Sequence, residues 1–280
     1  MAQPFNSNLV IEEKISEADF KAYSVGYEQN QFRFKPLVDL ICEVIPEFAL
    51  GYHEGKETPN TQIVSRLREA ARTIYGTNKF ENRGEFGELI LHLLLRDFHD
   101  TIPLVAKIYF KDAQNNAVHG FDGVHITIEP GKKKLWLGES KIYSDGFAGI
   151  SSLAEDLEKH IQADYLKSEF SLIKHKLPAN TPEIEYWRNL MDEHKNLDEI
   201  LNGICIPMVC TYSSKTVKDH NAITKDYVNA FTEECQKLKE KFDEKKIATN
   251  VEVILMLLPI PDKEELVTEL DERLKAMRMD

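Results

Sequence analysis

The sequence predicts an α/β fold in which a mixed central sheet is flanked by helices, with a helical extension on its N-terminal side. Apolar residues recur at intervals of three and four in several segments, as they do in amphipathic helices. Two β-rich segments meet at a turn over residues 130–133, which is typical of a hairpin. Two continuous apolar runs, residues 203–212 and 250–258, flank a helical segment, and this order is typical of parallel strands buried on both faces.

Helices dominate the N-terminal part of the chain. The apolar spacing predicts three helices, over residues 36–50, 61–75 and 82–98. Residues 76–78, Gly-Thr-Asn, have the residue types that end helices. Residues 1–35 are rich in aromatic side chains but show no clean period. We therefore expect residues 1–80 to form an N-terminal helical region that could dock a partner, and residues 81–280 to form the main domain.

Strands and helices alternate in the rest of the chain. The residue types predict strands over residues 104–110, 123–129, 134–143, 203–212 and 250–258. Helical spacing covers residues 149–176, 182–201, 224–245 and 262–277. Turn residues over 112–116 and 130–133 separate the first three strands, so that residues 123–143 are expected to form a hairpin.

The charge of the chain bears on its partners. Of the 280 residues, 42% are hydrophobic and 29% are charged, so a folded globular protein is expected rather than a disordered one. The 47 acidic and 35 basic residues give a formal net charge of −12. Binding to nucleic-acid phosphates depends largely on lysine and arginine. A nucleic-acid enzyme with this net charge would need a local basic stripe or a partner that holds the substrate.

Cysteine usage and hydropathy indicate the compartment. No C-x-x-C pair occurs, so a zinc ribbon or a redox motif is a poor fit. The cysteines lie among apolar residues, as buried reduced thiols do; they are Cys42, Cys205, Cys210 and Cys235. The N-terminus lacks the pattern of a secretory signal, and the strongest apolar run, residues 253–258, is far shorter than the ~20 residues that cross a bilayer. We expect a soluble, cytoplasmic protein with no membrane partner.

The most informative segment is residues 135–141, Leu-Trp-Leu-Gly-Glu-Ser-Lys. In a strand every second side chain shares a face, so Glu139 and Lys141 point the same way as the two leucines before them. An apolar face therefore ends in an acid and a base. Charged groups are seldom placed at the edge of a core unless they pair or bind something. This makes Glu139 and Lys141 candidate functional residues.

Asp122 is expected to lie beside Glu139. It comes at the start of the hairpin's first strand, where Gly120 and Gly123 leave room for a metal or simply make a bend. In a hairpin, the carboxylates of Asp122 and Glu139 could lie at the same end of neighbouring strands. They would repel each other unless a cation lay between them. Mg²⁺ prefers oxygen ligands of this kind.

A further acid could come from the helix over residues 82–98. Glu85 and Glu88 are three positions apart and share a helix face. We favour Glu88, because apolar residues flank it. The alternative is that both acids simply favour the start of a helix.

Together these residues predict phosphodiester hydrolysis. Asp122 and Glu139 would hold Mg²⁺, with Mn²⁺ as an alternative ion, and the ion would polarise a phosphate oxygen and lower the pKa of a bound water. Lys141 would orient that water or neutralise charge that develops on the phosphate. Glu88 would bind the metal or orient water behind it. The alternative is that Glu139 and Lys141 are no more than an ion pair on one face of a strand.

Other polar residues are weaker candidates. The histidines His92, His119 and His125 each stand alone in the sequence, and a lone histidine is usually structural or exposed. Residues 132–134 are three lysines that could touch phosphate, although a solvated turn is the simpler interpretation. Residues 213–215, Ser-Ser-Lys, are expected to form a loop, which could contact substrate because strand ends in α/β sheets often do.

An acid on a helix, then an aspartate, then Glu-x-Lys on the next strand resembles the PD-(D/E)xK nuclease superfamily. Four residues match its motif positions: Glu88, Asp122, Glu139 and Lys141. Residues 82–212 follow its order of helix, three strands, helix and strand. Phe121 stands where the motif has proline, a position that varies in the superfamily. The resemblance implies that residues 81–280 form a restriction-endonuclease-like nuclease domain.

Three segments carry a closer resemblance: residues 83–88 (Arg-Gly-Glu-Phe-Gly-Glu), 120–125 (Gly-Phe-Asp-Gly-Val-His) and 135–141. They are similar to the HamA family, the effector subunits of Hachiman anti-phage defence systems, and the length and order of elements agree along nearly the whole chain. The resemblance implies a DNA nuclease that is held by a helicase partner, HamB, and released to degrade DNA on infection. A helicase that grips the DNA would also compensate for the acidic net charge.

Two alternatives to a DNA nuclease stay open. The same fold could be a catalytically inactive adaptor or regulatory subunit of a nucleic-acid-processing complex, with residues 1–80 as its docking surface. RNA could also be the substrate.

Overall fold

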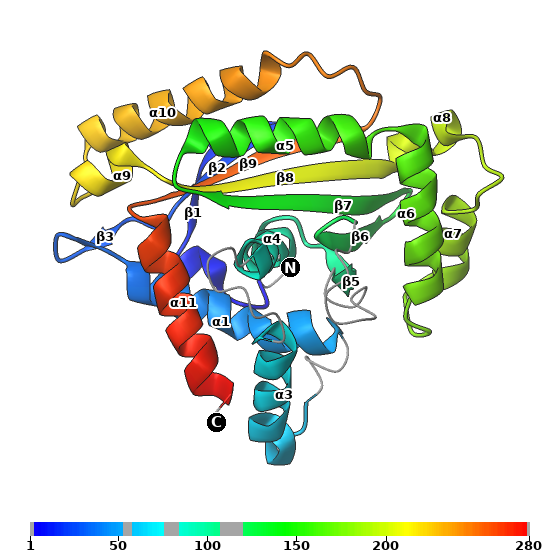
Figure 1. Ribbon diagram of the computed structural model, residues 1–280, viewed down its shortest axis with the longest axis horizontal. Helices are drawn as coiled ribbons and strands as arrows, with labels where there is room; N and C mark the ends of the chain where they lie inside the picture. The colour runs from blue at the N-terminus through cyan, green and yellow to red at the C-terminus, as the bar shows by residue number, and fades with distance from the viewer. Residues whose placement is uncertain (1–2, 53–57, 76–83, 107–119, 279–280) are drawn as a thin grey trace.

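The structure, a computed structural model, describes residues 3–52, 58–75, 84–106 and 120–278. A seven-stranded sheet lies between two layers of helices (Figure 1). Its strand order is β1-β2-β9-β8-β7-β6-β5, and β3 and β4 form a separate two-stranded sheet. The strands are β1 (Glu12–Ser16), β2 (Phe20–Ser24), β3 (Tyr27–Glu28), β4 (Gln31–Phe32), β5 (Ile102–Ala106), β6 (Gly123–Glu129), β7 (Lys132–Tyr143), β8 (Ile204–Ser213) and β9 (Glu252–Ile260).

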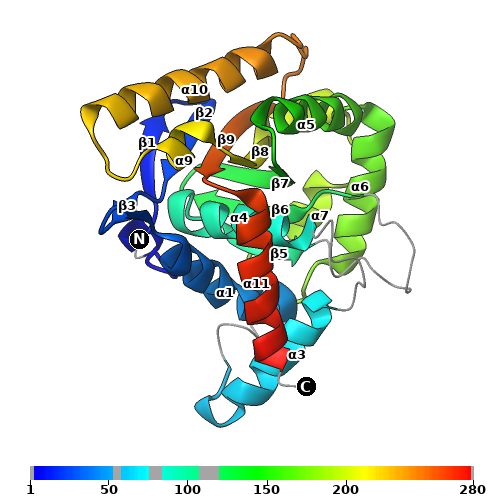
Figure 2. The ribbon, with the colours of Figure 1, turned by 60° about the vertical axis from the view of Figure 1, so that its left-hand side comes forward.

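The helices cover both faces of the sheet. They are α1 (Phe34–Leu50), α3 (Ile63–Tyr75), α4 (Gly84–Phe98), α5 (Gly146–His160), α6 (Ala163–Lys176), α7 (Ile184–Leu190), α8 (Leu197–Ile200), α9 (Lys215–Asp219), α10 (Lys225–Asp243) and α11 (Lys263–Arg278). Helices α5 and α10 lie on one face, and α1, α4 and α11 lie on the other (Figures 1 and 2). The predicted α/β fold, with its mixed sheet and its N-terminal helical extension, is confirmed.

The strand pairing confirms the two patterns that the sequence predicts. Strands β6 and β7 form an antiparallel hairpin in which Gly123 lies opposite Gly138. Strands β7, β8 and β9 run parallel to one another. Because helices cover both faces of the sheet, all residues of β8 except Ser213 are buried, as expected for a continuous apolar strand.

The N-terminal residues contain strands that the sequence did not predict. Strand β2 pairs antiparallel with β1 and parallel with β9, where Phe20 lies opposite Leu255. Each of β1 and β2 has only five residues and mixes polar with apolar side chains, so their period is weak. A partner strand more than 200 positions away in the chain fixes them instead. Strands β1 and β2 therefore belong to the main sheet, although they lie within residues 1–80. The division of the chain into two regions at residue 80 stays a prediction.

Some predicted boundaries differ from the structure. The helix predicted over residues 149–176 is broken, because Gln162 has an extended backbone between α5 and α6. The helix predicted over 182–201 is likewise split, and Asn196 caps the start of α8. Strand β5 covers the first part of the strand predicted over 104–110. Several predicted features lie outside the described residues: 76–78, 82–83, 107–110, 112–116 and His119.

The sheet separates two apolar cores. One core lies under α5, α6 and α10, and the other lies among α1, α3, α4 and α11. All four cysteines are buried and free, as predicted. In the described part of the chain, no helix combines the length and the apolar character needed to cross a membrane.

A buried polar cluster, here called the Glu47 cluster, joins α1 to α4 and β6. Glu47 on α1 accepts a hydrogen bond from Arg96 Nε at 2.6 Å, and its Oε1 lies 3.0 Å from His92 Nε2. Arg96 also donates to the carbonyl of Thr101, whose Oγ1 lies 2.7 Å from Nδ1 of His125 on β6. All five residues are buried. A buried charge of this kind depends on its partner, since removal of one partner leaves the other charge uncompensated.

Replacing Glu47 with alanine should lower the free energy of unfolding by about 3–5 kcal/mol, because Arg96 would stay buried without its carboxylate. The matched control is Glu69→Ala on α3, which removes a more exposed carboxylate 3.0 Å from Arg66. That variant should cost less than about 1 kcal/mol. Urea unfolding of both variants measures the two values, and equal losses would contradict the assignment.

Candidate active site

Glu139 and Lys141 lie on the face of β7 that α5 covers. Leu135 and Leu137, which share their alternation, belong to the core under α5, whereas Trp136 belongs to the opposite core. The end of this apolar face carries the carboxylate of Glu139, a residue that as a whole is only 3% exposed. The alternation of the sequence predicted this shared face.

The ammonium group of Lys141 bridges two carboxylates. Its Nζ lies 2.7 Å from Glu139 Oε1 and 2.7 Å from Oδ2 of Asp156 on α5. Burial lowers the pKa of Lys141, but the neighbouring carboxylates of Glu139, Asp156 and Asp122 outweigh burial and raise it above its ordinary value. Lys141 is therefore a fixed positive charge among acids.

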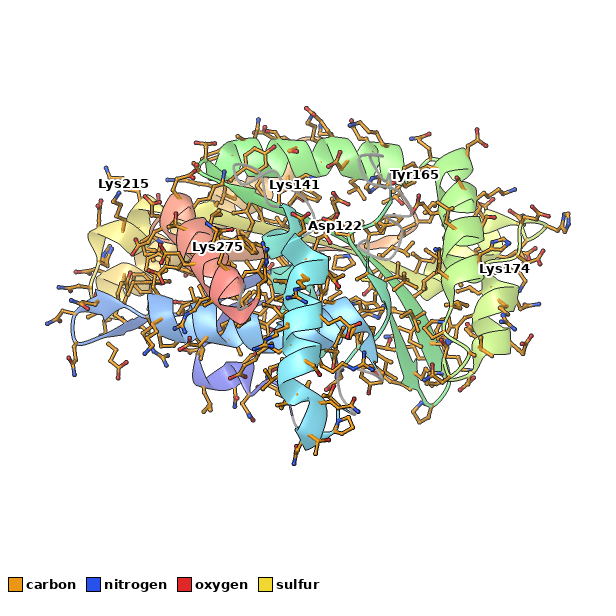
Figure 3. The ribbon with its side chains drawn as sticks, turned by 60° about the horizontal axis from the view of Figure 1, so that its bottom comes forward. Asp122, Lys141, Tyr165, Lys174, Lys215 and Lys275 are labelled. Carbon is orange, nitrogen blue, oxygen red and sulfur yellow. The ribbon has the colours of Figure 1, made fainter. Side chains whose placement is uncertain are left out.

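A backbone hydrogen bond holds Asp122 against the end of β7. The Asp122 N–H donates to the carbonyl of Gly138 at 2.9 Å, just before β6 begins. Its Oδ2 accepts hydrogen bonds from Ser140, at 2.9 Å from the backbone N–H and at 2.7 Å from the hydroxyl. Asp122 thus contacts the residue that separates Glu139 from Lys141. Figure 3 labels Asp122 and Lys141. These bonds join Asp122 to the segment of β7 that carries Glu139 and Lys141, and a metal site shared by Asp122 and Glu139 stays a prediction.

The last turn of α5 adds a histidine to the site. His160 Nδ1 lies 3.8 Å from Glu139 Oε2. Its ring stacks on Tyr165, with centroids 4.5 Å apart, and meets Phe121 at 4.7 Å in an edge contact. Phe121, at the position of the motif's proline, therefore helps to hold His160 next to Glu139.

Glu88, the fourth predicted residue, approaches from the other layer of helices. Helix α4 covers the face of the sheet opposite α5, and Glu88 lines a small cavity there with Glu47, His92 and Gly123. Glu88 therefore shares the lining of this cavity with Gly123, the residue after Asp122. Glu85 is also buried, so the structure does not decide between the two acids of α4.

The oxygen donors of Asp122 and Glu139 suit a hard cation. Within residues 3–52, 58–75, 84–106 and 120–278, no three histidine, cysteine, aspartate or glutamate side chains form a group that could hold a metal ion. Mg²⁺ commonly takes one or two carboxylates from a protein and fills its remaining positions with water and phosphate. Asp122 and Glu139 are two carboxylates of the type that Mg²⁺ takes.

The other histidines that the sequence singled out have structural surroundings. His92 and His125 belong to the Glu47 cluster, with ring centroids 4.9 Å apart. Burial lowers the pKa of His92 and of His125. Both rings therefore stay uncharged near neutral pH, which favours the structural alternative.

The lysine and serine segments also have structural partners. Lys133 pairs with Glu183 and lies over the ring of Tyr186, and Lys134 pairs with Glu252. In the serine segment, the hydroxyl of Ser214 accepts from Val217 N–H and caps α9, and that of Ser213 accepts from Lys263 N–H. These contacts favour structural roles for residues 133–134 and 213–214.

Sequence reasoning missed Ser140, Asp156 and His160. Ser140 separates the two residues of the Glu-x-Lys motif, and it anchors Asp122. Asp156 and His160 are four positions apart on α5, so they share one helix face. That spacing, on the first helix after the motif strand, was the signal that could have identified them.

Close packing of α4 on β7 fixes the position of the strand next to Glu139. A Cβ atom on Gly138 would lie 2.8 Å from Cδ2 and 2.9 Å from Cδ1 of Leu91 on α4. Leu91 is fully buried, so it has little room to move away. Gly138 accepts the hydrogen bond from Asp122 and precedes Glu139, so this contact supports both acids.

Comparison with known families gives a match along nearly the whole chain. A family model described as HamA matches residues 3–274 of the 280 residues. The matched range includes β1 and β2, the Glu47 cluster and the site at the end of β7. No curated protein matches the sequence.

The substitution Gly138→Ala should lower the free energy of unfolding by about 1–3 kcal/mol, because the added methyl group would overpack the α4–β7 contact. The control is Gly84→Ala on α4, where an added Cβ meets nothing within 4 Å. Alanine in place of this helical glycine should be neutral or stabilising by up to about 1 kcal/mol. Thermal unfolding compares the two variants, and an unchanged Gly138→Ala variant would contradict the packing argument.

Proposed function

We propose a nuclease function for this chain, which belongs to the HamA family of Hachiman defence-system proteins. Within that system it would be a metal-dependent DNA nuclease effector of anti-phage defence, and a helicase partner, HamB, would control it. The observation that carries the proposal is the ion pair of buried Glu139 with partly buried Lys141 at the end of β7, with Asp122 held against the same strand. Buried charges placed together in this way are typical of functional sites.

Each residue has a role in the proposed reaction. Asp122 and Glu139 would supply oxygen ligands for Mg²⁺ or Mn²⁺. The bound ion would polarise a phosphate oxygen and lower the pKa of a water molecule. Lys141, a fixed positive charge, would stabilise negative charge that develops on the phosphate. Glu88 would act from the α4 side, either on the metal or on water behind it.

A partner that holds DNA would compensate for the negative net charge of this chain, which disfavours binding to DNA phosphates. The chain carries a formal net charge of −12, and Lys133 and Lys134 are already paired with acids. Residues 1–80 are the proposed docking region. Within it, α3 exposes two apolar side chains, Ile63 at 55% and Val64 at 49%, which suits contact with a protein. We propose that this complex works in the cytoplasm.

Replacing both Glu139 and Lys141 with alanine should reduce Mg²⁺-dependent cleavage of plasmid DNA by at least about a hundredfold, because a ligand and a charge-stabilising group are lost together. The matched control removes another lysine–glutamate pair that β7 makes, with Lys133→Ala and Glu183→Ala. That control should cleave as the unsubstituted protein does. If the Glu139 and Lys141 double variant cleaves DNA as well as the unsubstituted protein, the assignment of these residues to the active site is wrong.

A catalytically inactive adaptor is the second candidate. Two observations favour it: Lys141 is engaged by two carboxylates, and the described residues contain no three-residue metal group. An adaptor of this family would bind its partner through residues 1–80 and leave the site unused. It would have no need to bind a divalent ion.

Calorimetric titration with Mn²⁺ separates the two candidates. A nuclease should bind the ion, and Asp122→Asn should weaken that binding by about tenfold or more, because one charged oxygen ligand is lost. Asp192→Asn, at an exposed ion pair with Lys174, is the control and should bind as the unsubstituted protein does. Absence of Mn²⁺ binding in the unsubstituted protein would favour the adaptor.

A further inference from the structure

Asp156 connects the buried site to the surface of α5. Its Oδ2 lies 2.7 Å from Lys141 Nζ, and its Oδ1 lies 3.4 Å from Lys159 Nζ. The exposed fraction of the side chain rises from 4% at Glu139 to 22% at Asp156 and 69% at Lys159. Negative and positive groups therefore alternate from the core outward.

Lys141 needs a second acid if Glu139 binds a metal. A divalent ion on Glu139 would weaken the attraction between that carboxylate, which contacts Lys141 through Oε1, and the ammonium group. It would also repel the ammonium group, since both are positive. A lysine that Glu139 alone held would then be held less firmly. The distances show that Glu139 is not its only holder.

We propose that Asp156 is a positioning residue that keeps the Lys141 ammonium group in place when Glu139 becomes a metal ligand. This inference rests on the proposed nuclease function. It adds separate roles for the two carboxylates that contact Lys141. Glu139 would bind the metal, and Asp156 would hold the lysine in position. Asp156 would touch neither the metal nor the phosphate.

The surroundings of Asp156 suit an anchor. Helix α5 packs closely on the sheet, since a Cβ atom on Gly149 would lie 2.7 Å from Cys210 Sγ on β8. The acid is therefore carried by a helix with little freedom to move. Burial raises the pKa of Asp156, but its hydrogen bond and charge contact with Lys141 outweigh burial and lower it. The carboxylate stays ionised near neutral pH.

The test compares DNA binding with and without a divalent ion. Asp156→Asn keeps the shape of the side chain and removes its charge. In EDTA, Glu139 still holds Lys141, so the variant should bind a labelled DNA duplex within about twofold of the unsubstituted protein. With Ca²⁺, which also takes oxygen ligands, its affinity should fall by about fivefold or more, because the charge-assisted bond to Lys141 is lost. In Mg²⁺ its kcat should fall by about tenfold or more.

Two controls assign the effect to Lys141. Lys159→Ala removes the other cation beside Asp156 and should leave DNA affinity and cleavage within about twofold of the unsubstituted protein. In a Lys141→Met background, Asp156→Asn should weaken Ca²⁺-dependent DNA binding no further, because the two residues act as one unit. Asp156→Glu, which keeps the charge, should restore part of the kcat lost in Asp156→Asn.

Several outcomes would overturn the role of Asp156. These are an Asp156→Asn variant with unchanged affinity in Ca²⁺, one with equal losses in EDTA and Ca²⁺, or one whose loss adds in full to that of Lys141→Met. If Asp156→Asn does not fold, Asp156→Ser is measured instead, and the same DNA affinities in EDTA and in Ca²⁺ are expected for it. Failure of the nuclease function itself is distinguishable, because the unsubstituted protein would then show no Mg²⁺-dependent cleavage.

Discussion

The bridge from Lys141 to the carboxylates of Glu139 and Asp156 is the interaction on which the site depends. Without a cation, acids brought this close at the edge of a core would repel each other or take up protons. Lys141 lies 2.7 Å from both and joins the end of β7 to α5. The site therefore lies between the sheet and helix α5. There Lys141 is mostly shielded from water, although 22% of its side chain stays exposed to solvent.

Packing on the opposite face fixes the strands that carry the acids. Asp122 is hydrogen-bonded to β7 through the carbonyl of Gly138 and through Ser140. Because Gly138 has no Cβ atom, Leu91 of α4 can pack directly against it. The Glu47 cluster then ties α4 to α1 and to β6. The hydrogen bonds of this cluster therefore connect α1 with the hairpin that begins after Asp122.

The sequence predicted those features of the fold and site that local pattern determines. The alternation over residues 135–141 placed Glu139 and Lys141 on one face, and the hairpin pattern placed Asp122 at the level of Glu139. Features that depend on distant pairing were not predictable in the same way. Strands β1 and β2 exist because β9 pairs with β2, and Asp156 meets Lys141 only because α5 folds back over β7. Glu88 lies on α4, which covers the face of the sheet opposite α5, and its place beside the other acids stays a prediction.

The nuclease proposal requires a metal ion between the acids of the site. The most direct measurement is the anomalous difference density of a crystal soaked in Mn²⁺. The account predicts a peak at about 2.0–2.2 Å from oxygens of both Asp122 and Glu139, with Lys141 Nζ kept on Asp156. Density that shows no ion between these carboxylates, or an ion bound elsewhere in the molecule, would contradict it.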